Sequence, residues 1–116
     1  MRKDIAELLA EMKPKFMRFP GGCLVHDGSL NSEDRDSMYR WKNTLGGLEG
    51  RPARRNNWGY NQTLGLGYYE YFCFCEDIGA KPVPVLPGGY DPHHQRITPM
   101  EEMQEWIDDA LDLIEF

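Results

Sequence analysis

The feature that most constrains the fold is an apolar run closed by Pro-Gly-Gly, which occurs twice in the chain. The first run covers residues 16–19 and closes in Pro20-Gly21-Gly22, and the second covers 82–86 and closes at 87–89. Nearly continuous apolar runs of this length are typical of buried strands in a parallel sheet. Proline ends such a strand because it cannot donate a ladder hydrogen bond. The glycines then bring bare backbone to the carboxyl end of the strand, where parallel α/β folds place their ligands.

Helical periodicity surrounds these two runs. Apolar residues at positions 5, 8, 9 and 12 follow the spacing of one helix face, and Pro14 ends that helix. A second helix is predicted over residues 66–78, with Gly79 as its C-cap. Its buried side chains are expected to be Tyr71, Phe72, Cys75 and Ile78.

A third helix is predicted at the C-terminal end. Thr98-Pro99-Met100-Glu101 matches a capping box with proline at the first helical position. From there the helix is expected to run to Phe116. Its apolar face is predicted to contain Met103, Trp106, Ile107, Ala110 and Ile114.

The order of these elements predicts a right-handed parallel βαβ unit. Between the first strand and the second helix, residues 20–65 show no convincing periodicity. We interpret this stretch as a functional loop, because it follows the glycine-rich strand end and carries Trp41 and Trp58. Two strands cannot form a self-sufficient parallel sheet. The chain is therefore expected to be part of a larger barrel.

Composition excludes several classes of partner. A net charge of −6 disfavours a nucleic-acid backbone or an anionic membrane surface. The sequence contains no apolar run close to the roughly 18 residues of a membrane span. Three cysteines do not make a disulfide framework, and the N-terminal residues predict an amphipathic helix rather than a signal-peptide core. These features indicate a reducing, cytoplasmic location, while secretion of a longer parent protein stays open.

Neither a metal nor a cofactor is expected. The adjacent His93 and His94 point apart, and no further ligands are spaced for zinc. Cys73 and Cys75 would lie on different faces of their helix. The sequence Gly65-Leu66-Gly67 opens a helix as a dinucleotide loop does, but Glu70 stands where a third glycine would be needed.

Several blocks of sequence, taken together and in order, resemble the α-L-arabinofuranosidases of glycoside hydrolase family 51. These blocks are residues 18–23, 39–46, 49–52, 58–60 and 75–85. The resemblance implies a (β/α)8 TIM-type barrel followed by a β-rich domain. Residues 1–116 would then form a single partial domain of about two early β/α units, with the substrate loop at about 20–65.

The resemblance also implies a reaction, the retaining hydrolysis of terminal α-L-arabinofuranosyl residues from hemicellulose-type glycans. Such hydrolysis requires two carboxyl groups about 5–5.5 Å apart. In the family the acid/base glutamate follows an asparagine, and this sequence contains no Asn-Glu pair. We therefore expect both catalytic glutamates to lie outside this chain and the isolated chain to be inactive. Glu33, Glu49 and Glu76 are interpreted as solvated charges.

The same resemblance assigns part of a sugar subsite. It places Gly21, Gly22 and Cys23 at the floor of the subsite and Trp58 at its wall. Cysteine stands where many family members have asparagine, and a thiol is the weaker hydrogen-bonding group. Two structural alternatives stay open at this point. Cys23 could be a small buried filler, and Trp58 could anchor the loop in the core.

Other residues receive structural interpretations. Trp41 is expected to pack the loop, and Arg51 is expected to tie it down through bidentate hydrogen bonds. A non-catalytic carbohydrate-binding or assembly segment is the rival function. Self-association is also predicted, because an incomplete barrel leaves apolar surface open. That surface is expected around Phe72, Val83, Val85 and Trp106.

Overall fold

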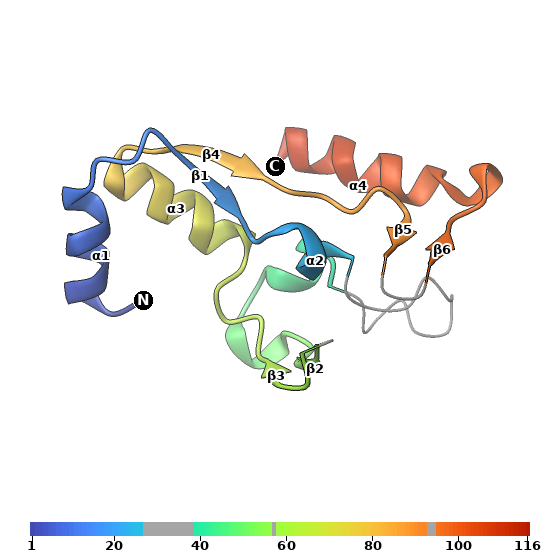
Figure 1. The fold of residues 1–116 in the computed structure, drawn as a ribbon, viewed down its shortest axis with the longest axis horizontal. Coiled ribbons are helices and arrows are strands. Elements are labelled where there is room, and N and C mark those ends of the chain that lie inside the picture. Colours follow the sequence, from blue (N-terminus) through green and yellow to red (C-terminus); the bar gives the residue numbers. More distant parts are fainter. Residues whose placement is uncertain (27–38, 57, 93–94) are drawn as a thin grey trace.

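The computed structural model describes residues 1–26, 39–56, 58–92 and 95–116 (Figure 1). The longer helices are α1 (Lys3–Glu11), α3 (Tyr68–Ile78) and α4 (Gln104–Glu115), and a short helix α2 covers Gly22–Val25. Two strands of four residues, β1 (Phe16–Phe19) and β4 (Lys81–Pro84), form one sheet. Two hairpins pair β2 (Arg54–Arg55) with β3 (Asn61–Gln62) and β5 (Tyr90–Asp91) with β6 (Arg96–Ile97). Short 3-10 helices are η2 (Trp41–Thr44), η3 (Leu48–Gly50) and η4 (Met100–Glu102).

The predicted parallel βαβ unit is confirmed. Strands β1 and β4 pair in parallel with Phe16 opposite Lys81 and Phe19 opposite Pro84. Helix α3 connects them and lies against one face of the pair (Figure 1). The aromatic core of this unit centres on Phe19, which is 1% exposed. Its ring contacts the rings of Tyr68, Tyr71 and Phe72 at centroid distances of 5.6, 4.6 and 5.4 Å.

In the described chain only one face of the strand pair is buried, and Val83 is exposed as expected for an incomplete barrel. Side chains alternate between the faces of a strand, and α3 packs against the face that carries Phe19. Phe16 and Val83 belong to the opposite face, because Val83 is paired with Arg18, one residue out of phase with Phe19. They are accordingly 62% and 42% exposed. The chain therefore leaves one face of the strand pair open.

Two of the three predicted helices begin and end near their expected positions. Helix α1 ends at Glu11, before Pro14, but it buries none of its residues. Helix α3 ends at Ile78, and its C-cap Gly79 adopts the left-handed conformation with φ of 70°. In α3, Cys75 is buried as predicted, whereas Tyr71, Phe72 and Ile78 are half-buried. Tyr68 and Phe74, which the sequence pattern did not select, are also buried.

The predicted start of the third helix is wrong. Residues 98–101 form no capping box. The cap position before η4 is Pro99, which has no side-chain cap hydrogen bond, and Thr98 Oγ1 instead accepts a hydrogen bond from Trp106 Nε1 at 3.2 Å. Helix α4 begins only at Gln104. Its buried residues are Trp106, Asp109 and Leu113, while Ile107 and Ile114 of the predicted face are 47% and 82% exposed. Trp106 is 4% exposed and so is not open for association.

The described part of residues 20–65 contains regular structure, namely α2, η2, η3 and the β2–β3 hairpin. Close backbone contacts attach it to α3. Thr44 Oγ1 donates to the Trp41 carbonyl at 2.6 Å and accepts from the Tyr68 backbone N–H at 2.9 Å. A Cβ on Gly67 would lie 2.0 Å from the Thr44 carbonyl oxygen. Only glycine therefore permits this approach of η2 to the start of α3.

Candidate functional site

The candidate site lies at the carboxyl edge of the β1–β4 pair, because parallel strands end on the same side of their sheet. After β1 the chain turns at Gly21, whose φ of 139° is a conformation that favours glycine. Gly22 begins α2, and Cys23 is the next residue of this helix. The ring of His26, which follows α2, lies 6.3 Å from the ring of Tyr90 in β5. The elements that follow the two strands thus meet over one edge.

Cys23 is exposed on α2. The interpretation of Cys23 as a small buried filler is therefore wrong for the described chain. An exposed thiol that follows a strand end can contact a ligand over the edge, although it donates and accepts hydrogen bonds weakly. A Cβ on Gly21 would meet nothing within 4 Å, whereas one on Gly22 would lie 3.5 Å from Arg18 Nη2.

Tyr68 fixes the same edge from the α3 side, and the sequence pattern did not identify it. Its hydroxyl donates to the Val85 carbonyl, directly after β4. Val85 in turn donates its backbone N–H to the Phe19 carbonyl at 2.7 Å. Burial raises the pKa of Tyr68 well above its usual range. The hydroxyl therefore stays protonated and acts as a fixed donor that positions the strand ends.

Trp58 lies in the turn of the β2–β3 hairpin and is 54% exposed. Within the described residues, Trp58 therefore does not anchor the loop in the core of this chain. Its ring is nearly parallel to that of Tyr60, with an interplanar angle of 22° and a centroid distance of 6.4 Å. Within the described residues, Trp58 and Cys23 lie on separate elements, the hairpin and α2 (Figure 1). The chain thus presents the two predicted parts of the subsite on different supports.

Arg51 ties the loop to α3, as the sequence predicted. Its guanidinium donates to both carboxylate oxygens of Glu70, at 2.7 and 3.0 Å. It also donates to the carbonyls of Gly46 and Leu64, each at 2.8 Å. The Arg51 guanidinium lowers the pKa of Glu70, and Glu70 raises the pKa of Arg51. All these bonds lie within the chain, so Arg51 has a structural role.

A buried carboxylate on α4 holds the loop at residues 40–42, and the sequence pattern did not identify it. Asp109 is 3% exposed. Its Oδ2 accepts from Arg40 Nε at 2.9 Å and Nη2 at 2.5 Å, and Lys42 Nζ forms an ion pair with Oδ1 at 2.9 Å. The backbone carbonyl of Asp109 accepts from Trp41 Nε1 at 2.9 Å. The prediction that Trp41 packs the loop is thus confirmed.

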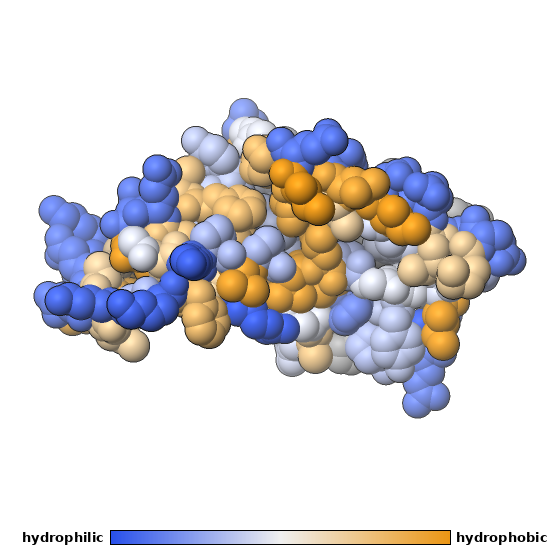
Figure 2. Space-filling view, turned by 90° about the horizontal axis from the view of Figure 1, so that it is seen from above, coloured by the Kyte–Doolittle hydropathy of each residue, from blue (hydrophilic) through white to orange (hydrophobic). Residues whose placement is uncertain are grey.

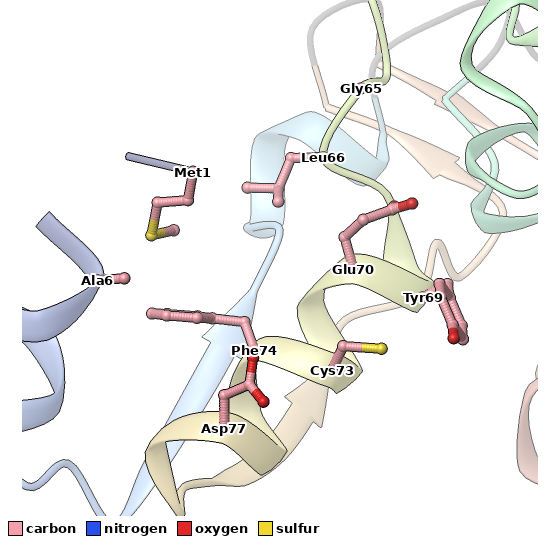
Figure 3. A pocket seen from close by; sticks show the side chains of 9 residues that line it. All are labelled: Met1, Ala6, Gly65, Leu66, Tyr69, Glu70, Cys73, Phe74 and Asp77. Carbon is pink, nitrogen blue, oxygen red and sulfur yellow. The ribbon is translucent and has the colours of Figure 1, made fainter. Parts of the chain in front are cut away.

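One hollow beside α3 is not assigned as an active site. It has a volume of about 370 Å³ and separates α1 from α3 (Figure 3). Glu70 lies in its lining, but the Arg51 guanidinium lowers the pKa of this carboxyl, whereas a general acid needs a raised one. A second hollow of about 670 Å³ lies between α3 and α4 and is mainly apolar. We interpret both hollows as helix surfaces that the rest of the described chain does not cover.

Metal ligands do not gather in the described part of the chain, where no three His, Cys, Asp or Glu side chains could hold an ion. His93 and His94 lie outside the described residues. The three cysteines are free thiols. Cys75 is buried and Cys73 is half-exposed, so the two lie in different surroundings on α3, as predicted.

The fold and the site define a class of protein: a β/α unit whose glycine-rich strand ends and exposed aromatic loop are suited to a carbohydrate ligand. A family model described as the alpha-L-arabinofuranosidase 1 domain matches residues 8–116. The chain belongs to this family.

Known proteins agree with this assignment. The chain is 48% identical over its whole length to an extracellular exo-alpha-L-arabinofuranosidase of Streptomyces chartreusis, of which it covers 15%. It is 38% identical over 99% of its length to alpha-L-arabinofuranosidase 1 of Arabidopsis thaliana, of which it covers 16%. Among solved structures, the arabinose-bound MgGH51 α-L-arabinofuranosidase aligns with a TM-score of 0.81 at 38% identity, over 96% of this chain and 17% of that one. The chain thus spans less than a fifth of the length of these relatives.

Proposed function

We propose that this chain supplies the early β/α units of the (β/α)8 barrel of a retaining α-L-arabinofuranosidase. The enzyme would remove terminal α-L-arabinofuranosyl residues from hemicellulose-type oligo- or polysaccharides. The observation that carries the proposal is the parallel β1–β4 pair with its glycine-rich carboxyl edge, together with the close alignment to an arabinose-bound enzyme. Residues 1–116 act here as one partial domain, and further strands of the barrel would cover the open face of the strand pair.

In this proposal the chain contributes binding and no catalytic carboxylate. Gly21, Gly22 and Cys23 form the floor of the arabinofuranosyl subsite, and Trp58 offers its ring to the apolar face of the sugar. The acid/base and nucleophile glutamates come from outside these residues, since the sequence contains no Asn-Glu pair. No metal or cofactor takes part.

The activity of the isolated chain tests this division of roles. We expect the purified 116-residue chain to release no arabinose from a nitrophenyl α-L-arabinofuranoside, and a longer polypeptide that contains it to release arabinose with retention. Turnover by the isolated chain, purified free of contaminating glycosidases, would show that the carboxylates have been assigned to the wrong part of the protein.

Substitutions of Cys23 in the longer enzyme test the subsite. Cys23→Asn should retain kcat/KM, because an amide offers fuller hydrogen bonding. Cys23→Leu should lower kcat/KM about tenfold to hundredfold, because an unpaired substrate hydroxyl costs roughly 1–3 kcal/mol. Cys73→Leu on α3 is the matched control and should leave kcat/KM unchanged. Full activity of Cys23→Leu would remove Cys23 from the subsite.

Carbohydrate binding without turnover is the second candidate function for the chain by itself. It is favoured by the exposed rings of Trp58 and Tyr60. Titration of the 116-residue chain with arabinoxylan oligosaccharides, followed by tryptophan fluorescence, tests it. An unchanged emission at millimolar oligosaccharide would reject this candidate.

We also propose that the isolated chain self-associates. Apolar side chains gather over α4 in the space-filling view (Figure 2), where Ile107, Leu111 and Ile114 are 47%, 53% and 82% exposed. Val83 adds to the open surface on the strand pair, whereas Phe72 and Val85 are half-buried. Sedimentation at tens of micromolar should show dimers or larger species, and a folded monomer would contradict this.

The location of the protein also stays a proposal. None of the described helices has the length and apolar character needed to cross a membrane. The cytoplasmic location predicted from the sequence competes with the extracellular location named for the Streptomyces relative. Arabinofuranosidase activity in the culture medium rather than in washed cells would decide against the cytoplasm.

A further inference from the structure

The turn of the β2–β3 hairpin holds two aromatic rings in the solvent. Asn56 is 6% exposed, and its Oδ1 accepts from the backbone N–H groups of Trp58 and Tyr60 at 3.0 and 3.2 Å. The Asn56 and Gly59 backbones close the turn through two further hydrogen bonds of 3.0 Å. Tyr60 is 57% exposed beside the nearly parallel ring of Trp58. These hydrogen bonds order the backbone that carries the two rings, although the rings themselves are exposed.

The same hairpin is positively charged within an acidic chain. Residues 50–69 contain three arginines and no aspartate or glutamate, although the net charge of the whole chain is −6. Arg51 is committed to Glu70. Arg55 is exposed, and in the described part of the chain its guanidinium has no carboxylate partner. A Cβ on Gly59 would lie 3.6 Å from Arg55 Nη2, so this guanidinium lies against the turn that carries both rings.

We propose that Arg55 and Tyr60, next to the Trp58 ring that is assigned to the arabinofuranosyl unit, form an accessory subsite for a carboxylate-bearing sugar, a uronic acid residue of the same glycan. The exposed Tyr60 ring accepts the apolar face of the uronic acid, and the planar guanidinium of Arg55 matches its carboxylate through two parallel hydrogen bonds. A nucleic acid would also offer stacking and negative charge, but the net charge of −6 opposes its approach. The inference rests on the proposed function for the arabinofuranosyl subsite and adds a preference for acidic glycans.

Two probes that differ in one group test this subsite. The first is a xylooligosaccharide with a single glucuronic acid branch, and the second is the same compound after reduction of its carboxyl group to an alcohol. The 116-residue chain should bind the acidic probe about tenfold more tightly than the reduced one, as a single charge-assisted hydrogen-bonded contact implies. The preference should shrink at high salt, because Arg55 is exposed. Shifts of the tryptophan indole N–H resonances report both binding and the folded state.

Single substitutions test the contribution of the Arg55 charge and that of the Tyr60 ring to binding separately. Arg55→Gln should abolish the preference for the acidic probe and leave the affinity for the reduced probe unchanged. Arg96→Gln, an exposed arginine on the β5–β6 hairpin, makes the same change of charge elsewhere and should retain the preference. Tyr60→Ala should weaken the binding of both probes. Equal affinities of the unaltered chain for the two probes, absence of binding, or tighter binding of oligothymidylate would overturn the proposal.

A kinetic measurement keeps this inference distinct from the proposed function. In the longer enzyme, arabinosylated forms of the two probes serve as substrates, and the ratio of their kcat/KM values should fall to about one in Arg55→Gln. Arabinose release with a ratio of one in the unaltered enzyme would overturn the acidic subsite alone. Absence of arabinose release together with tighter binding of the acidic probe would overturn the proposed activity and support the subsite.

Discussion

Asp109 offers the sharpest test of how the long loop is held. Its side chain is 4% exposed and meets two cations from the loop, of which Arg40 is 18% exposed and Lys42 is 40% exposed. Both cations also have a second carboxylate, Glu105 for Arg40 and Asp112 for Lys42. Asp109→Asn removes the buried charge at almost constant shape, so its effect reports the ion pairs rather than a cavity.

The loss of stability expected for Asp109→Asn depends on how well Arg40 and Lys42 remain compensated. Removal of one member of a buried ion pair costs about 3–5 kcal/mol when the other charge is left without compensation. Here each cation retains a second carboxylate and some access to water, so we expect Asp109→Asn to lower the free energy of unfolding by about 2–3 kcal/mol, close to the value of one hydrogen bond between charged groups. In a domain of this size that loss corresponds to a fall in Tm of about 8–12 °C.

Asp112→Asn is the matched control. It removes a carboxylate that also contacts Lys42 but is 50% exposed. Its cost should be no more than about 1 kcal/mol, because exposed ion pairs are weak. Urea unfolding, with the slope and midpoint fitted for each variant, measures both changes. Equal destabilisation by the two substitutions, or a loss below about 1 kcal/mol for Asp109→Asn, would refute the view that the buried carboxylate holds the loop.

Two further predictions concern the start of α3. Gly67→Ala should lower the free energy of unfolding by about 1–3 kcal/mol, because its Cβ would lie 2.0 Å from the Thr44 carbonyl oxygen. Gly50→Ala is the control, because nothing lies within 4 Å of the added carbon there, and thermal unfolding measures both variants. Arg51 lowers the pKa of Glu70 in the folded state, so this pair contributes its full stability above pH 4.5, the ordinary pKa of a glutamate, and loses it as the pH falls through the lower folded-state pKa. Glu70→Gln should therefore flatten the acid limb of a plot of unfolding free energy against pH, and an unchanged acid limb would exclude the pair as a source of acid sensitivity.

The sequence by itself determined those features that depend on local geometry. Pro20 and Gly21 determined the end of β1. Proline cannot donate a hydrogen bond to continue the strand ladder, and glycine can adopt the φ of 139° seen at Gly21. Gly79 ended α3 for a similar reason, with a left-handed residue at the helix C-terminus. The apolar runs with a helix between them were sufficient to predict the parallel pairing of β1 and β4. Each of these rules acts over a few residues and is readable from one stretch of chain.

Only the tertiary structure decided which side chains become buried at long range. The apolar pattern of α4 predicted Ile107 and Ile114 as its inner face, yet Asp109 is buried because cations 67 and 69 residues away in the sequence neutralise it. Thr98 was expected to cap a helix, but the indole of Trp106 takes its hydroxyl as an acceptor. These outcomes depend on which segments meet in space, and the energy of an ion pair or hydrogen bond depends on the burial that the meeting creates.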